Sequence, residues 1–304
     1  MSTIAADTAL APAAARPAER MQRAARRWRY LTNVGAGVLS AVLLVWTLTP
    51  IYNIIMVSFE AEGDVFSDHL WPPNASANSF WIVLSQGYWY LEYFWHQFGN
   101  SVYIASMVTL LVLTIGSLTS FSVMRMRIRN GWVITNAALL TYVIPASFLA
   151  IPFYRIMGLY GLTNNLWSVI AAEVTFATPY AIFIFQEYGR SIPLELDESA
   201  RIDGASPLQI YFRIYLPLMV PALVAVGTFA LLAAWNEYLY QFLLLSSKRS
   251  MTVPVALAQF LNSDEAPWNY MMAAVIIYAL PPVAIYYAFR GRMTAGLTTG
   301  GVKG

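Results

Sequence analysis

The chain has 304 residues, of which only 11% are Asp, Glu, Lys or Arg, whereas 58% are hydrophobic and 15% are aromatic. Soluble globular proteins carry about 25% charged residues, so this composition argues strongly against a soluble enzyme. The formal net charge of +2 gives no broad basic surface for nucleic acid, and the absence of cysteine removes disulfides and thiolate metal sites.

The N-terminal segment, residues 1–30, is an Arg-rich tail that its Ala- and Pro-rich composition predicts to be disordered. Residues 31–59 follow as the first long run without charges. A helix needs about 20 apolar residues to cross a bilayer, so this run predicts the first transmembrane helix. It is too long for the apolar region of a signal peptide, and we expect it to be retained.

Residues 60–97 form an acidic loop rich in Trp, Tyr, Phe and Pro, which we expect to be periplasmic. Residues 98–290 form the predicted core, and residues 291–304 form a C-terminal tail. Five further apolar runs contain at most one acid each: residues 93–124, 130–154, 156–186, 214–247 and 266–289. Continuous runs of this length predict helices, because the strands of membrane barrels are shorter and alternate in polarity. We therefore expect an all-α integral membrane protein with six transmembrane helices.

The basic residues predict the orientation of these helices. Of the eighteen Lys and Arg residues, only Arg155, Lys248 and Arg249 fall outside the two tails and the loops on the same side as the tails. The positive-inside rule then places both termini in the cytoplasm.

The cytoplasmic loop at residues 187–217, between the fourth and fifth predicted spans, contains the signals of two short helices. Gly204 is placed as a helix stop, and Ser206 with Gln209 forms a capping-box pattern in which Pro207 takes the first helical position. A solvated connector is the alternative interpretation. A compact pair of amphipathic helices is instead suited to docking a partner protein.

The same loop resembles the EAA motif of ABC importer permeases. The residues that carry the resemblance are Glu198, Ser199, Ala200, Arg201, Ile202, Asp203, Gly204 and Ala205, followed by Phe212, Ile214, Leu216 and Pro217. Ser199 departs from the usual Ala. The WNEYL segment at residues 235–239 and the closing GLTTGGVKG also resemble the smaller permease of maltose-type carbohydrate importers. The resemblance covers most of the chain from Phe98 onward and implies a type I ABC importer permease fold in a bacterial inner membrane.

The resemblance also implies a function and partners. The 187–217 loop would form the coupling helices, which seat in a groove of a cytoplasmic ATPase subunit, and Glu198 would meet a basic side chain there. Gly204 would permit the tight turn between the helices. The implied partners are a second, homologous permease, two copies of the ATPase and membrane lipid. An external sugar-binding protein is also implied, and it would contact the Lys248–Trp268 segment.

Catalysis by this chain is not expected. The sequence contains no G-x-x-x-x-G-K-[ST] phosphate loop, and its only lysines are Lys248 and Lys303. His69 and His96 have neither a metal-ligand spacing nor a nucleophile elbow beside them. We expect no metal and no cofactor in this chain, with ATP and Mg used by the partner ATPase.

Trp235, Asn236, Glu237 and Tyr238 are the candidate substrate contacts in the fifth span. Their donors, acceptors and rings suit sugars, whose hydroxyls take hydrogen bonds while the C–H face lies on an aromatic ring. A polar clamp between helices is the alternative role. The alternative function is an ion-coupled secondary transporter, but such folds usually show internal repeats, which this sequence does not clearly display.

Overall fold

The computed structural model describes residues 15–61, 69–126, 128–262 and 266–298. Within these ranges every regular element is a helix. The chain divides into two compact units, Met1–Met56 and Val57–Gly304, which are described separately.

The first unit is built on α1 (Ala15–Phe59), a helix of 45 residues with Pro50 inside it. Residues 15–30 are helical, so the prediction of disorder is wrong for this part of the tail; residues 1–14 lie outside the described residues. The physical reason is that Ala and Arg are among the best helix formers and continue the span toward the N-terminus. A lone helix cannot bury its own side chains, so apolar residues such as Leu43 and Trp46 require lipid or another protein around them.

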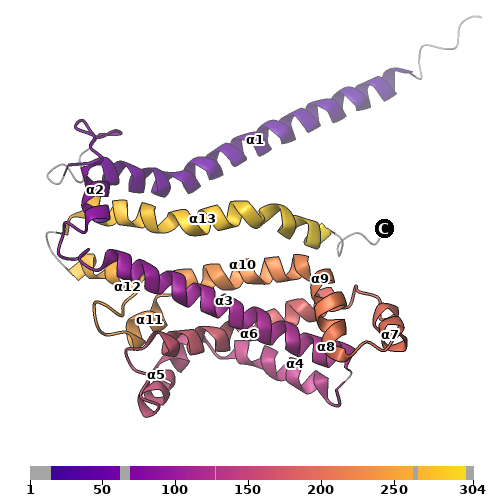
Figure 1. Cartoon of the computed structure of the whole chain (residues 1–304). Coiled ribbons are helices and arrows are strands. Elements are labelled where there is room, and N and C mark those ends of the chain that lie inside the picture. Colours follow the sequence, from indigo (N-terminus) through magenta and orange to yellow (C-terminus); the bar gives the residue numbers. More distant parts are fainter. Residues whose placement is uncertain (1–14, 62–68, 127, 263–265, 299–304) are drawn as a thin grey trace, which may run out of the picture. The chain divides into compact units, whose positions relative to one another are not determined.

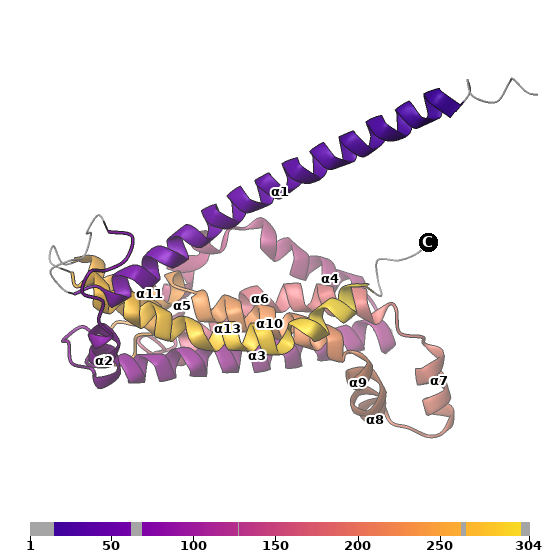
Figure 2. The ribbon, with the colours of Figure 1, turned by 90° about the horizontal axis from the view of Figure 1, so that it is seen from above.

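Four long helices form the body of the second unit (Figures 1 and 2): α3 (Phe94–Arg125), α6 (Leu166–Gly189), α10 (Val220–Asn236) and α13 (Trp268–Thr298). They run side by side, with α3 packed on both α6 and α10, and α13 packed on α10. A Cβ added at Gly116 of α3 would lie 3.0 Å from Ala181 and 3.1 Å from Phe185 of α6. Small residues at this contact let the two backbones approach closely, as is common between membrane helices.

Three predicted spans of the second unit correspond to single helices. The run 93–124 becomes α3 with each bound moved by one residue, and the run 266–289 lies almost wholly within α13. The run 156–186 becomes α6, but this helix begins only at Leu166. The delay arises from the turn before it, where Gly161 and Asn164 have φ of 68° and 57°, and from Asn165, whose side chain caps α6 by accepting from the Trp167 amide at 2.9 Å.

The third predicted span, residues 130–154, is wrong as a single helix. The structure has α4 (Gly131–Leu140), two 3₁₀ turns, η1 (Thr141–Val143) and η2 (Ala146–Leu149), and α5 (Ala150–Leu159). The interruption centres on Pro145, which cannot donate a helical hydrogen bond and forces the preceding Ile144 toward extended geometry, with φ −92° and ψ 119°.

The fifth predicted span, residues 214–247, is also interrupted. Helix α10 ends at Asn236 and the short α11 (Leu239–Leu244) follows it. At the other end, the Pro207–Leu218 helical segment meets α10 at an angle of 77°. By length and hydropathy, four helices among the described residues can cross a membrane, or five if this bent pair counts as one span.

Short helices occupy the loops predicted to lie outside the membrane. The 60–97 loop contains α2 (Asn78–Ser85), which packs on α13. There, Asn269 donates from Nδ2 to Ser79 Oγ at 3.2 Å and to the Glu60 carbonyl at 3.3 Å. Between α11 and α13 lie α12 (Val253–Ala258) and η4 (Gln259–Asn262). These segments are therefore folded parts of the second unit.

Candidate functional site

The 187–217 loop forms a lobe at one end of the second unit, at the opposite end from α5, α11 and α12 (Figures 1 and 2). It consists of α7 (Glu195–Ile202), α8 (Pro207–Ile210), a π-helical turn η3 (Tyr211–Tyr215) and α9 (Leu216–Leu218). We call this lobe the coupling lobe, after the role that the sequence predicts for it.

The turn between α7 and α8 is fixed by local hydrogen bonds, as the sequence predicts. Gly204 has φ 82° and donates its amide to the Arg201 carbonyl at 3.0 Å, while the Ala205 amide donates to the Ala200 carbonyl at 2.9 Å. This pair of bonds is the Schellman pattern that ends a helix at a left-handed glycine. The predicted capping box at Ser206 is confirmed as well, with both reciprocal bonds to Gln209 present.

The predicted coupling residues divide between two faces of the lobe. Glu198, Ser199, Asp203, Gly204 and Pro217 are exposed, whereas Ala200, Ala205 and Leu216 are half-buried and pack against the core of the unit. The acids of the motif therefore face outward, and its apolar side chains hold the lobe in place.

Three apolar side chains of the coupling lobe are exposed over most of their surface, which the sequence does not show. Ile202 is 87% exposed, Leu208 66% and Phe212 62%. They come from the end of α7, from α8 and from η3. Exposed apolar groups beside polar ones are typical of a surface that another protein covers.

A buried ion pair that the sequence analysis missed joins the lobe to α3. Arg125 and Asp197 are 4% and 3% exposed, and Arg125 Nη1 lies 3.4 Å from Asp197 Oδ2. In the sequence, both residues lie in loops predicted to be cytoplasmic or at the ends of these loops. One signal was available: neighbours on a helix point about 100° apart, so Asp197 and Glu198 cannot both face the same partner.

Two buried tyrosines attach the second half of the lobe to the same helix. A hydrogen bond of 2.7 Å joins the hydroxyls of Tyr211 and Ser117, and one of 3.0 Å joins those of Tyr215 and Ser120. The ring of Phe121 lies edge-on to both tyrosine rings, with centroid distances of 5.2 Å. Both halves of the coupling lobe thus contact the last three turns of α3.

The structure separates the four predicted substrate contacts into two pairs. Trp235 is 3% exposed and stacks on Tyr278 at 4.7 Å, and the Tyr278 hydroxyl donates to the Trp235 carbonyl at 2.6 Å. Glu237 caps α11 by accepting from the amides of Tyr240 at 2.7 Å and Gln241 at 3.0 Å. These two side chains are held by the fold itself.

Asn236 and Tyr238, in contrast, line an open hollow of about 510 Å³ at the break between α10 and α11. The other lining residues come from α12, the 3₁₀ turn after it and α13: Pro254, Leu257, Ala258, Leu261, Met271 and Tyr278. Pockets of this size hold small-molecule ligands, and this one combines apolar walls with a few polar groups.

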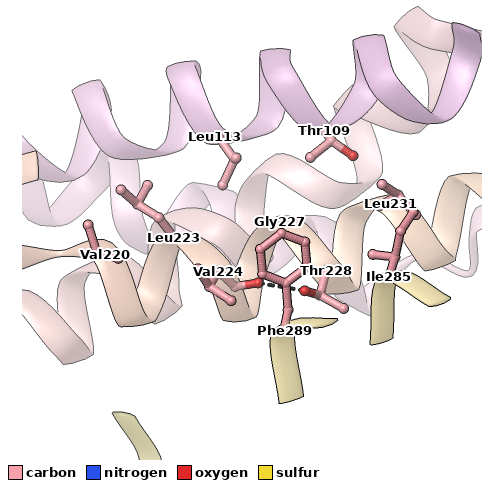
Figure 3. Close-up of a pocket in the computed structure, with 10 residues that line it drawn as sticks. All are labelled: Thr109, Leu113, Val220, Leu223, Val224, Gly227, Thr228, Leu231, Ile285 and Phe289. Carbon is pink, nitrogen blue, oxygen red and sulfur yellow. Dashed lines mark hydrogen bonds between the residues drawn. The ribbon is translucent and has the colours of Figure 1, made fainter. Parts of the chain in front are cut away.

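A second cavity, of about 270 Å³, lies between α3, α10 and α13 (Figure 3). Its walls are apolar, apart from two threonines whose hydroxyls are engaged within their own helices. Thr109 donates to the Ala105 carbonyl at 2.7 Å, and Thr228 donates to the Val224 carbonyl at 2.8 Å. Such a lining lacks the convergent donors and acceptors that a sugar needs, so this cavity is not a candidate for the substrate path.

Residues 113–298 match the family of binding-protein-dependent transport system inner membrane components. The chain belongs to this family. The permease is 30% identical over 279 residues to the inner membrane ABC transporter permease protein YcjP of Escherichia coli strain K12, across 91% of this chain and 98% of that protein. It is 29% identical over 269 residues to the trehalose transport system permease protein SugB of Mycobacterium tuberculosis, across 88% and 96% of the two chains.

The fold of the permease is shared with a chain of a bacterial ABC transporter involved in the import of the acidic polysaccharide alginate. The two align with a TM-score of 0.76 and 22% identity, covering 87% of the permease and 97% of the other chain. The family match includes both the coupling lobe and residues 235–238. The permease is therefore an inner-membrane transport component, and its family does not support the alternative of an ion-coupled secondary transporter.

Proposed function

We propose that the permease is one of two homologous transmembrane subunits of an ATP-driven, binding-protein-dependent sugar importer, and that it forms half of the translocation path. The observation that carries this proposal is the coupling lobe, in which a helix, a left-handed Gly204 turn and a capped second helix expose Glu198. The trehalose transport assigned to one relative by its name supports a sugar as the solute.

The coupling lobe is the proposed docking site for one of two ATPase subunits. The proposed coupling residues remain those of the EAA motif. The exposed Glu198, Ser199, Asp203, Gly204 and Pro217 would face the ATPase, and Ala200, Ala205 and Leu216 would hold the lobe on the body of the unit. Glu198 provides a charge for a basic side chain, and the exposed Ile202 and Phe212 provide apolar anchors beside it. A rigid lobe transmits the movement of the ATPase to the membrane helices as a rigid body, which converts hydrolysis into alternating access. ATP and Mg are bound by the ATPase, and this chain needs no cofactor.

Six spans with both termini in the cytoplasm remain the proposed topology. The segment from Gly131 to Leu159 supplies the additional crossing as a broken span, since α4 and α5 are each only ten residues long. Broken helices are tolerated at membrane depth where protein surrounds them or they line a cavity. The basic residues in both tails and in the 125–129 loop support this orientation.

The hollow beside Asn236 and Tyr238 is the proposed contribution of this subunit to the substrate path. Asn236 offers an amide to sugar hydroxyls, and Tyr238, whose ring stacks with Phe242 at 5.5 Å, offers a hydroxyl and an aromatic edge. Trp235 and Glu237 support the site, because they hold the ends of α10 and α11 on either side of the break.

The external binding protein is proposed to contact the Lys248–Trp268 segment. Its first residues are fixed by amide side chains of α3: Gln97 donates to the Lys248 carbonyl and Asn100 to the Arg249 and Met251 carbonyls, each at 2.9 Å. The beginning of the segment, held in this way, presents a preformed surface, so docking there loses little conformational entropy.

Co-purification and energised uptake test the proposal together. A tagged permease should retain a second permease and two ATPase copies, and sugar uptake into cells should stop when ATP is depleted. Uptake should persist when ionophores collapse the ion gradients. Uptake that follows the ion gradients, by a permease that retains no ATPase, would contradict the proposal.

A further inference from the structure

Arg125, the last residue of α3, is a buried charge at the point where the coupling lobe joins the body of the second unit. The lobe is exposed to solvent over much of its surface, yet this guanidinium lies beneath it. We propose that Arg125 is the positioning residue through which movement of α7 is transmitted to α3 and α6. This inference rests on the proposed docking of the ATPase to the coupling lobe.

The contacts of Arg125 join three segments at one side chain. Its Nη2 donates to the carbonyl of Ile192 at 2.9 Å and to that of Gly189, the last residue of α6, at 3.3 Å. Its Nη1 lies 3.4 Å from Asp197 of α7. The backbone carbonyl of Arg125 in turn accepts from Arg201 Nη2, also on α7, at 3.0 Å. The Nη1 of Arg125 also donates to the Pro193 carbonyl at 3.5 Å. Two contacts therefore run to α7, and three run to the end of α6 and the turn after it.

The surroundings of Asp197 make the ion pair the main restraint on α7. Within the part of the chain that the structure describes, neither buried carboxylate oxygen of Asp197 has a hydrogen-bond partner. Among the residues that the structure describes, the charge of this carboxylate is paired with Arg125. Separation of α7 from α3 would break this ion pair together with the hydrogen bond from Arg201 to the Arg125 carbonyl, so we expect the two helices to move together.

The second half of the lobe is attached to α3 by two further hydrogen bonds, besides the Arg125 guanidinium, which lies 5.8 Å from the centroid of the Tyr215 ring. The hydrogen bonds of Tyr211 with Ser117 and of Tyr215 with Ser120 lie one to two turns before Arg125 on α3. They involve neutral groups only. Loss of the ion pair should consequently loosen α7 while α8 and η3 stay in place, and the expected defect is in coupling rather than in folding.

The test compares three variants in the complete importer reconstituted in proteoliposomes: Arg125→Met, Asp197→Leu and the double variant. The measured quantity is the amount of sugar imported per ATP hydrolysed, because a residue that only stabilises the fold would leave this ratio unchanged in complexes that assemble. Arg129→Met is the matched control, since Arg129 lies four residues further on and is exposed.

We expect Arg125→Met and Asp197→Leu to retain the ATPase during purification and to import at least tenfold less sugar per ATP. The double variant removes both buried charges, so it should regain thermal stability but not the transport ratio. Arg129→Met should import as much sugar per ATP as the wild type. A normal ratio in either single variant, or a ratio restored in the double variant, would overturn the inference. Failure of the wild-type permease to retain any ATPase would instead overturn the proposed function.

Discussion

Gly204 provides a sharp test of the coupling lobe, because its substitution changes the backbone preference and little else. The residue has φ 82°, and a Cβ added to it meets no other atom within 4 Å. The cost of Gly204→Ala is therefore torsional, about 1–2 kcal/mol for an L residue held in the left-handed region. A cost of this size lowers the population of the native turn by about 5- to 30-fold relative to competing conformations.

The chain contains a matched control for this substitution. Gly161, in the turn between α5 and α6, has φ 68° and likewise no atom within 4 Å of an added Cβ. Gly161→Ala should lower the thermal stability of the permease by about the same amount as Gly204→Ala. Only Gly204→Ala changes the lobe that is proposed to dock the ATPase.

The assay is capture of the purified ATPase subunit by the detergent-solubilised permease complex. We expect the apparent Kd to rise by up to about 30-fold for Gly204→Ala, because only lobes with the native turn bind, and to stay at the wild-type value for Gly161→Ala. The apparent Kd of Gly204→Asn should lie between those of the wild type and Gly204→Ala, because Asn adopts the left-handed region more readily than Ala. Equal weakening by both Ala substitutions, or no weakening by Gly204→Ala, would refute the reasoning.

Three further predictions concern the cap, the candidate substrate path and the close helix contact. Ser206→Ala should cost about 1 kcal/mol of local stability through loss of the cap, seen as faster hydrogen exchange in α8 alone. Trp235→Ala should lower the melting temperature strongly, since truncation of a buried aromatic costs about 3–5 kcal/mol, whereas Tyr238→Ala should reduce sugar uptake at nearly unchanged melting temperature. Gly116→Leu should prevent the close approach of α3 and α6 and abolish stable expression; wild-type levels would contradict the packing.

Features that depend on neighbouring residues in the sequence could be predicted. The turn at Gly204 and the capping box of Ser206 and Gln209 follow from local hydrogen bonding, and both are confirmed. The bounds of α3 follow from the length of one apolar run. The all-helical fold follows from the same runs, because a backbone in lipid must satisfy its own hydrogen bonds.

Features that depend on tertiary contacts could not be predicted in the same way. The sequence shows Pro145 inside an apolar run. Membrane helices can either kink or break at a proline, so the sequence alone does not predict which of the two occurs here. Arg125 and Asp197 are 72 positions apart, and the directions of side chains on one short helix do not show which distant charge the fold will pair with Asp197. The sequence places Trp235 among the possible sugar contacts because of its residue type. Its stacking on Tyr278 could not be foreseen, since it arises only when α10 and α13 pack together.

Cross-linking from the coupling lobe tests the central claim most directly. The chain contains no cysteine, so a single introduced cysteine is the only reactive thiol of the permease. Ile202→Cys and Leu159→Cys replace side chains that are both 87% exposed, at the ends of α7 and α5, helices that lie at opposite ends of the second unit (Figure 1). In the assembled importer, a short thiol cross-linker should join the permease to the ATPase from position 202 and not from position 159. Absence of this product at position 202, or equal product at both positions, would contradict the account.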